Sequence, residues 1–244
     1  MPSVRDLRDR IRSLKNTQQI TKAMKQVAAA KIRRAEVAKQ QARPYADTLL
    51  EMLRDLMHAV THVDHPFMNP GKEGAPSGII LMTADKGLAG AFNSNVVRAA
   101  EAYARDSGDV RYYTVGTKAR NAVRRWGMPD HPTWALGTSG KLETARAVAH
   151  RVTEDFNAGT ISGITLVSSK MLSMMSQKPE VRKLVPIPPI DSTAGARGAV
   201  EFAPSPEFVL SRLLPKYLEF TIFSAMLETD AAFFAAQLIA MNNA

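Results

Sequence analysis

Apolar and small residues near the start of the chain recur at alternating steps of three and four positions, which is the spacing of a coiled-coil seam. This seam comprises Val4, Leu7, Ile11, Leu14, Gln18, Thr21, Lys25, Ala28, Ile32 and Ala35. Residues 4–63 contain no Gly, and their only Pro is Pro44. We therefore predict one long helix over this range, bent near Pro44.

The same predicted helix carries a second apolar face. At about 100° per residue, Ile20, Met24 and Val27 lie nearly opposite the start of the seam. Two apolar faces on one helix predict two different sets of neighbours.

The last part of the chain repeats the three-four alternation without a break. Its seam comprises Tyr217, Phe220, Ser224, Leu227, Ala231, Phe234, Leu238 and Met241. Two seams at opposite ends of one chain predict that the terminal helices pair as an antiparallel coiled coil, with the middle of the chain inserted between them. The alternative is that each helix packs on the central domain instead.

The middle of the chain alternates short apolar runs with amphipathic stretches. Strands are predicted over 78–82, 110–115 and 163–167, and helices over 93–106, 117–126 and 141–157. This alternation predicts an α/β fold with a mostly parallel, Rossmann-like sheet. Segments 65–76 and 186–206 are rich in Pro, Gly and polar residues and are interpreted as linkers. The predicted domains are an amino-terminal shaft helix over 1–64, the α/β domain over 76–190 and a carboxyl-terminal shaft helix over 205–244.

The positive charge of the chain is concentrated in the first predicted helix. The formal net charge is +9, and residues 1–43 hold twelve basic and three acidic side chains, whereas residues 44–244 hold twenty of each. Such a helix raises nucleic acid as a partner, but residues 1–44 contain no aromatic side chain on which a base could stack. Because seam residues separate the basic clusters, we interpret the charges as flanking an interface, with a merely solvated face as the alternative.

Two classes of protein are excluded by composition. The chain has no Cys, which excludes a disulfide scaffold, a thiol nucleophile and Cys-ligated metal. The longest apolar run near either end, Ala231–Met241, is shorter than the roughly 20 residues of a membrane span. The charged start of the chain lacks the apolar core of a signal peptide, so Met1 is interpreted as the mature start.

Motifs of catalysis are not found. No segment has the spacing of a phosphate-binding loop, and Gly87 and Gly90 lack the third glycine of a dinucleotide site. The segment Asp85–Gly90 follows the first predicted strand, where α/β sheets commonly bind ligands, but a generic turn is the favoured interpretation.

Two clusters of polar side chains are candidates for a metal site and for a serine nucleophile, and neither is predicted to have that role. His58, His62, Asp64 and His65 have the spacing of metal ligands but lie beside a linker without a fixed fourth ligand, so no metal is predicted. The serines within 168–176 have no activating base placed by sequence and are interpreted as a polar loop anchored by methionines. We predict no catalytic residues and no cofactor.

Two segments resemble the gamma subunit of F-type ATP synthase. They are LRDRIRSLKNTQQITKAMKQVAAAKIRRAE, Leu7–Glu36, and TADKGLAGAFNSNVVR, Thr83–Arg98. SQKPEVRKLVPI, Ser176–Ile187, and the carboxyl-terminal segments LLPKYLEFTIFSAMLE and AAQLIAMNNA add weaker support. The resemblance thus spans nearly the whole chain.

The resemblance implies a central rotor shaft without an active site of its own. Its expected partners are the alpha and beta subunits of the catalytic hexamer, the epsilon subunit and the membrane c-ring, with catalysis on the beta subunits. The basic shaft is expected to meet acidic loops of those beta subunits. Rotation driven by proton flow would be coupled to ATP synthesis or hydrolysis. The expected location is the cytoplasmic face of a bacterial plasma membrane, as a peripheral protein that binds no nucleic acid and no small-molecule substrate of its own.

By the same resemblance, two groups of residues are expected to contact partner subunits. The first group lies on the shaft and comprises Ile20, Thr21, Lys22, Ala23, Met24 and Lys25. The second group follows the first strand and comprises Asp85, Lys86, Gly87, Leu88, Gly90, Phe92, Asn93 and Asn95. Purely structural packing is the alternative role for the apolar members of both groups.

The chain departs from the family pattern at three places. Ala89 stands where the family usually has Cys, and residues 230–234 with Gln237 replace a polar stretch of the family. The family's terminal helix also continues beyond the position of Ala244, so the chain is expected to be either a fragment or a shaft with a single-stranded tip.

Three functions remain distinguishable by experiment. The leading hypothesis is a mechanical coupling subunit, the second is an α/β enzyme or nucleotide-binding protein with its ligand at Asp85–Gly90, and the third is a nucleic-acid binder. ATP affinity of the isolated chain would favour the second, and salt-sensitive DNA binding would favour the third.

Overall fold

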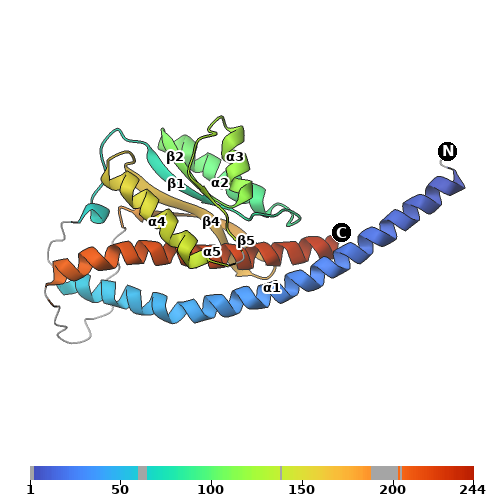
Figure 1. Ribbon diagram of the computed structural model, residues 1–244, viewed down its shortest axis with the longest axis horizontal. Coiled ribbons are helices and arrows are strands. Elements are labelled where there is room, and N and C mark those ends of the chain that lie inside the picture. The colour runs from blue at the N-terminus through green and yellow to red at the C-terminus, as the bar shows by residue number, and fades with distance from the viewer. Residues whose placement is uncertain (1–2, 60–64, 138, 188–202, 204) are drawn as a thin grey trace.

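The two ends of the chain form long helices that lie side by side in the computed structural model, and an α/β domain lies along one flank of the pair (Figure 1). The structure describes residues 3–59, 65–137, 139–187, 203 and 205–244. Helix α1 spans Val4–Ala59 and helix α5 spans Pro206–Asn243, and they run in opposite directions. The predicted antiparallel pairing of the terminal helices is therefore confirmed.

Both long helices begin at side chains that cap free backbone N–H groups. The Ser3 hydroxyl accepts a hydrogen bond from the Asp6 N–H at 3.2 Å, and the Asp6 carboxylate accepts from the Ser3 N–H at 2.9 Å. At the start of α5, the Ser205 side chain accepts from the Phe208 N–H, and Pro206 occupies the first turn, where its missing N–H costs nothing. α1 continues through Pro44 and curves rather than ending there.

The seam of α1 is buried only where α5 lies beside it. Ala28, Ile32 and Ala35 are buried as predicted, and the same alternation continues through buried Leu49, Leu53 and Leu56. The earlier seam residues Val4, Leu7, Ile11 and Leu14 are 47–67% exposed. The first turns of α1 project past α5 (Figure 1) and contact neither α5 nor the α/β domain.

The sheet of the α/β domain has the strand order β3-β2-β1-β4-β5. The strands are β1 Ser77–Met82, β2 Val110–Val115, β3 Thr133–Trp134, β4 Gly163–Ser173 and β5 Ser176–Val185. β1 pairs in parallel with both β2 and β4, and β3 is parallel to β2, whereas β5 is antiparallel to β4. The predicted α/β class and mostly parallel sheet are confirmed.

Helices cover both faces of this sheet. The helices are α2 Phe92–Ser107, α3 Thr117–Arg125 and α4 Lys141–Asn157, with a short 3-10 helix over Pro66–Met68. Ile79, Leu81 and Tyr112 pack against α2 and α3 on one face. The other face packs against α4 and α5 in a core that also includes Leu49, Leu53 and Leu56 of α1. The shaft and the α/β domain therefore share one continuous core, and α5 belongs to both.

The interpretation of residues 168–176 as a loop is wrong. β4 extends to Ser173 and forms a hairpin with β5, with Ser168 opposite Glu180 and Ser169 opposite Pro179. Ser168 and Ser169 are 3% and 2% exposed. Their composition is poor in strand-forming residues, so the strand depends on pairing with β5 rather than on local preference.

A buried carboxylate, Asp155, joins the end of α4 to β2. It accepts hydrogen bonds from the Tyr113 hydroxyl at 2.5 Å and from Arg151 Nε at 3.0 Å, and Arg111 lies 3.8 Å away. Burial raises the pKa of Asp155, but these hydrogen bonds and positive charges more than offset burial, so its pKa lies below the usual value. The ionised form is the one that the folded protein favours.

Replacing Asp155 with Asn is expected to destabilise the fold by about 1.5–3 kcal/mol at neutral pH, the typical value of hydrogen bonds to a charged group. Because the folded pKa is depressed, this stability is present above the unfolded pKa of roughly 3.9 and is lost as pH falls through the folded pKa. Urea unfolding of the free chain at pH 7 and pH 3 measures both effects. Asp106→Asn, at an exposed site on α2, is the control. An equal difference at the two pH values would contradict the role of the ionised carboxylate.

Candidate functional site

The ligand crevice of an α/β sheet normally lies beyond the carboxyl ends of its strands. In this chain, helix α5 covers that position. Phe233 and Phe234 of α5 pack with Ala84, Ala89 and Phe92, which follow β1, and the Phe92 and Phe233 rings lie edge to face with centroids 5.8 Å apart. Ile32 of α1 completes this apolar cluster. The chain's own helix thus packs against the segment where the second hypothesis puts a nucleotide, and a hollow of about 320 Å³ lined by Asp85, Lys86 and Phe233 remains beside it.

Two polar side chains of the segment 83–95 brace it internally. Asp85 accepts hydrogen bonds from the Thr117 N–H at 2.9 Å, the Thr117 hydroxyl at 3.1 Å and the Gly137 N–H at 3.0 Å. Asn93 accepts from the Ala84 N–H at 3.0 Å and donates to the Lys86 carbonyl at 3.2 Å. Both side chains therefore hold the segment on the sheet, and their contact with a partner subunit stays a prediction.

A close approach of two backbones fixes the position of the same segment. Gly116 has φ +96°, and a Cβ built on it would lie 2.0 Å from the Thr83 carbonyl oxygen. The Thr83 hydroxyl also accepts a hydrogen bond from the Ala119 N–H at 2.7 Å. A side chain at position 116 could not be accommodated, so the start of α3 is tied closely to the end of β1.

The remaining members of the second predicted group divide between interior and surface. Phe92 is buried, Gly87 is half-buried, and Asn95 is half-buried with its side-chain oxygen bonded to Arg98 at 2.6 Å. Lys86, Leu88 and Gly90 are exposed. Leu88 is 64% exposed and has φ +62°, a conformation that costs energy for any residue with a Cβ. Its exposed side chain is the part of this group best placed to meet a partner.

The first predicted group lies on the surface of α1. Ile20 is 60% exposed, Lys22, Ala23 and Lys25 are exposed, and Thr21 and Met24 are half-buried. At 1.5 Å per residue, this group lies roughly 10–18 Å along α1 from Ile32, which belongs to the cluster around Phe92. The first group on the shaft and the second group in the α/β domain are thus near one another, although α1 and the sheet come from distant parts of the sequence.

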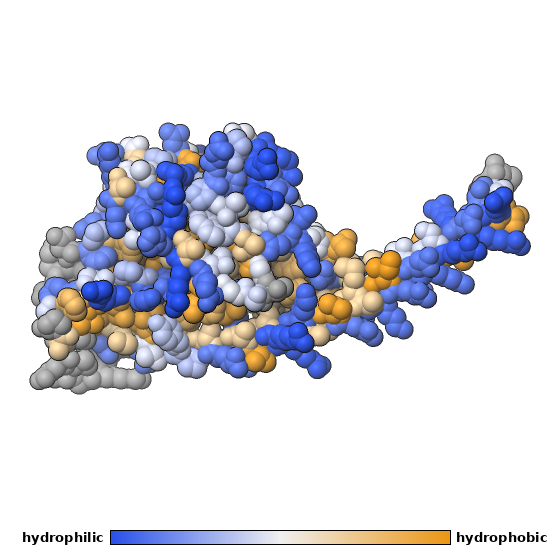
Figure 2. Space-filling view, in the orientation of Figure 1, coloured by the Kyte–Doolittle hydropathy of each residue, from blue (hydrophilic) through white to orange (hydrophobic). Residues whose placement is uncertain are grey.

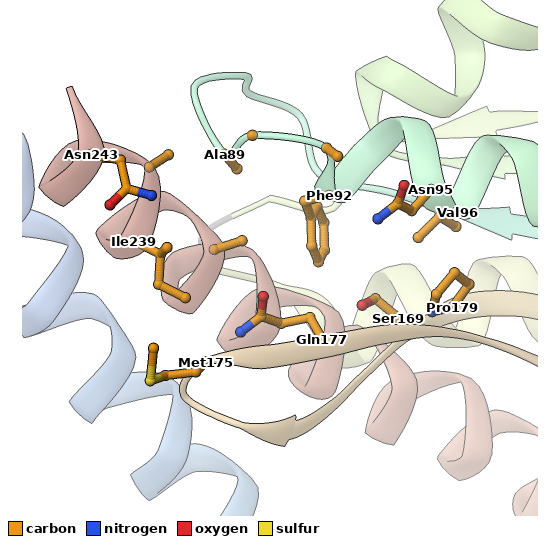
Figure 3. Close-up of a pocket in the computed structure, with 14 residues that line it drawn as sticks. Ala89, Phe92, Asn95, Val96, Ser169, Met175, Gln177, Pro179, Ile239 and Asn243 are labelled. Carbon is orange, nitrogen blue, oxygen red and sulfur yellow. The ribbon is translucent and has the colours of Figure 1, made fainter.

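A hollow of about 250 Å³ adjoins the second group (Figure 3). α5 contributes Ile239 and Asn243, the β4–β5 hairpin contributes Met175 and Gln177, and Phe92 points into the space between them. None of its lining residues carries a titratable side chain. Such a hollow can hold an apolar or amide side chain of a neighbour, but its lining offers no general acid or base, and so none that could activate the Ser169 hydroxyl.

The projecting end of α1 is predominantly hydrophilic with separate apolar side chains (Figure 2). Its exposed basic residues are Arg5, Arg8, Arg10, Arg12 and Lys15, next to exposed Asp6 and Asp9. This end of the shaft combines a positive surface with the four exposed seam residues. It is suited to a partner that covers it on several sides and carries acidic groups.

Sequence reasoning missed a group of charges beneath the Phe234 ring. Lys31 lies 4.9 Å from that ring's centroid, and Lys141 of α4 pairs with Asp230 of α5 at 3.2 Å. Burial raises the pKa of Asp230, although the positive charge of Lys141 acts in the opposite direction. The signal available in the sequence was the departure from the family pattern at 230–234, which includes Asp230 and Phe234.

Two further features bear on metal and membrane binding. Among the residues that the structure describes, no group of three or more His, Cys, Asp or Glu could hold a metal ion. Of the histidine cluster singled out in the sequence, His62 and Asp64 lie outside the described residues.

α5 is long and apolar enough to cross a membrane by length and composition alone, but 67% of its most apolar window is buried in this protein, as in a core helix.

A long antiparallel helical shaft with an α/β domain fixed to its flank defines a structural stalk protein. A family model described as ATP synthase matches residues 3–244. The ATP synthase gamma chains of Pelotomaculum thermopropionicum and Phenylobacterium zucineum are 43% and 40% identical, each over 100% of this chain and 87% of the relative. The chain belongs to the ATP synthase gamma-chain family, which confirms the resemblance seen in the sequence.

Solved structures share the fold. The central stalk of the Tetrahymena thermophila mitochondrial ATP synthase, solved with its c-ring, has a TM-score of 0.66 at 23% identity, over 92% of this chain and 98% of that chain. The rotor of the Euglena gracilis mitochondrial ATP synthase has a TM-score of 0.63 at 18% identity, over 98% of this chain and 89% of that chain. These likenesses confirm the combination of paired terminal helices and an inserted α/β domain.

Proposed function

We propose that this gamma chain is the central rotor stalk of an F-type ATP synthase, which couples proton-driven rotation to ATP synthesis or hydrolysis on partner beta subunits. The observation that carries the proposal is the first part of α1, which projects past α5 with apolar and basic side chains exposed. An exposed seam of this kind is unfavourable in water unless a partner covers it. The chain itself contributes no catalytic group to the reaction.

The alpha and beta subunits of the catalytic hexamer are the proposed partners of the shaft. Ile20–Lys25 and the exposed residues Lys86, Leu88 and Gly90 would face them. Complementary charge is expected on the ring, because the projecting part of α1 is strongly basic. Asp85, Phe92 and Asn93 would act indirectly, by holding the exposed residues in position.

The end of the molecule away from Val4, where α1 ends and α5 begins, is the proposed site of the epsilon subunit and the membrane c-ring. The Tetrahymena relative of similar fold is part of a central stalk solved with a c-ring. The relatives of highest similarity described above are bacterial, which supports a peripheral location on the cytoplasmic face of a plasma membrane. Proton-driven rotation at that end would then be carried through the shaft.

Purification from the native membrane tests this function. An affinity tag on this chain is expected to recover alpha and beta subunits together with ATPase activity, and release of the complex should require membrane disruption or low salt. The isolated chain should bind neither ATP nor DNA, because it has no phosphate-binding loop and α1 lacks aromatic side chains before Tyr45. Recovery of the chain alone, with measurable ATP affinity, would overturn the proposal in favour of a nucleotide-binding protein.

A further inference from the structure

Three carboxylates of α5 make directional contacts with three different elements around it. Glu219 accepts a hydrogen bond from Arg146 Nε of α4 at 2.8 Å, and Asp230 pairs with Lys141 of α4 at 3.2 Å. Glu228 accepts from the Met171 N–H of β4 at 2.9 Å and pairs with Lys39 of α1. α5 is thereby joined by charged groups to the α/β domain on one side and to the other shaft helix as well.

The three carboxylates lie on two opposite sides of α5. At about 100° per residue, Glu219 and Asp230 point within roughly 20° of each other, whereas Glu228 points about 180° from Glu219. They cover eleven residues, or roughly 17 Å of helix. A helix that is held on opposite sides at separated heights cannot roll about its own axis without breaking at least one contact.

The carboxylates of these contacts are largely shielded from solvent, although their partners Arg146 and Lys39 are 53% and 43% exposed. The side chains of Glu219, Glu228 and Asp230 are 15%, 18% and 19% exposed, and that of Lys141 is 9% exposed. Lys141 also donates to the Gly137 carbonyl at 2.8 Å, which extends the contact to the loop that Asp85 holds. Apolar packing between α5 and the sheet resists separation but is non-directional. The charged contacts depend on direction and therefore resist rotation of α5 relative to the α/β domain.

We propose that Glu219, Glu228 and Asp230 form a torsional key that prevents α5 from rolling within the α/β domain, so that torque applied to the domain passes into the shaft. This inference rests on the proposed rotor function. It assigns a positioning role to three residues that do not touch the catalytic sites. Without these three contacts, the α/β domain would remain attached to α5 through the apolar core but would rotate more easily relative to it.

The angular fluctuation of the α/β domain tests the key directly. The chain has no Cys, so Ser94→Cys at an exposed position on α2 provides a unique attachment site for a bead. The complex of this chain with alpha and beta subunits is attached to a surface, and ATP hydrolysis is inhibited so that the ring holds the shaft still. The bead then reports how far the α/β domain turns relative to the shaft. The triple variant Glu219→Gln, Glu228→Gln, Asp230→Asn is expected to widen the angular distribution severalfold.

Two further variants separate a torsional role from a loss of folding. Lys141→Met with Asp230→Leu removes the Lys141–Asp230 pair, together with the hydrogen bond from Lys141 to the Gly137 carbonyl, and replaces both charged partners by apolar groups, a change that commonly leaves stability intact. It should widen the distribution less than the triple variant, with an unchanged melting temperature. Glu180→Gln removes a carboxylate whose pairs, with Lys170 and Arg182, lie inside the β4–β5 hairpin rather than with α5, and it should leave the distribution unchanged.

The outcomes distinguish the key from the rotor function on which it rests. If the unaltered chain fails to assemble with alpha and beta subunits, the proposed function is wrong. If the key variants assemble and rotate with the same angular width as the unaltered chain, the rotor function stands and the key is wrong. Proton pumping against an increasing gradient should also fail earlier in the triple variant than in Glu180→Gln, while ATP hydrolysis without a gradient is equal in the two.

Discussion

Replacing Met24 with Lys is expected to reduce proton pumping much more than ATP hydrolysis in the assembled complex. Met24 is half-buried beside exposed Ile20 and outside the core clusters of the α/β domain, so the change should leave the fold of the free chain intact. The added ammonium group is long enough to reach the surrounding ring and to form contacts there that hold the shaft during rotation. We expect a severalfold loss of protons pumped per ATP hydrolysed.

The measurement uses reconstituted vesicles in which hydrolysis and pumping are followed in the same preparation. Met24→Leu keeps the apolar character and should retain coupling. Gln41→Lys adds the same charge at an exposed site farther along α1 and should behave like the unaltered chain. Melting curves of the free chains should coincide. If pumping falls only in proportion to hydrolysis, Met24 does not act through the ring and its predicted contact role is wrong.

Amide hydrogen exchange should show the projecting turns of α1 as the least protected part of the free chain's helices. Val4, Leu7, Ile11 and Leu14 have no packing partner there, and a helix end without tertiary packing is marginal in water. Exchange over residues 4–14 should therefore approach that of an unfolded peptide. On assembly with alpha and beta subunits, protection of the same residues should rise by orders of magnitude as the ring covers them.

The internal controls for this experiment lie in the same helix. Residues 28–35 and 49–56 include the buried seam positions and should be protected in both the free and the assembled chain. Strong protection of residues 4–14 in the free monomer would mean that they dock elsewhere, contrary to the arrangement of α1. Unchanged weak protection after assembly would mean that the ring does not cover them and would remove the main support for the rotor proposal.

The predicted contact residues were found by resemblance, and the structure divides them by environment. Leu88 and Ile20 are exposed and available, whereas Phe92 and Asn93 serve the interior. A sequence motif cannot separate these roles, because residues that present a surface and residues that brace it occur side by side in the same segment. Whether the exposed members contact the ring stays a prediction.

The β4–β5 hairpin and the environment of Asp230 show where sequence reasoning fails. Serines and methionines at 168–176 have weak strand preference, and only their pairing with β5 makes a strand of them. Asp230 meets Lys141, which is distant in the sequence, and no local pattern links the two. Both features depend on which surfaces meet after the chain has folded.

The sequence by itself determined the long terminal helices, their three-four seams, the alternating strands and helices between them, and the concentration of basic charge on one helix. These features follow from backbone periodicity, since one face of a helix or strand must be apolar to be buried. Only the tertiary structure decided that α5 serves both as shaft and as a layer of the α/β domain, that it packs against the segment after β1, and that three of its carboxylates are held by neighbours on opposite sides. Those features depend on contacts between residues far apart in the chain. The free energy of these contacts comes from burial and charge pairing, which a local sequence pattern does not contain.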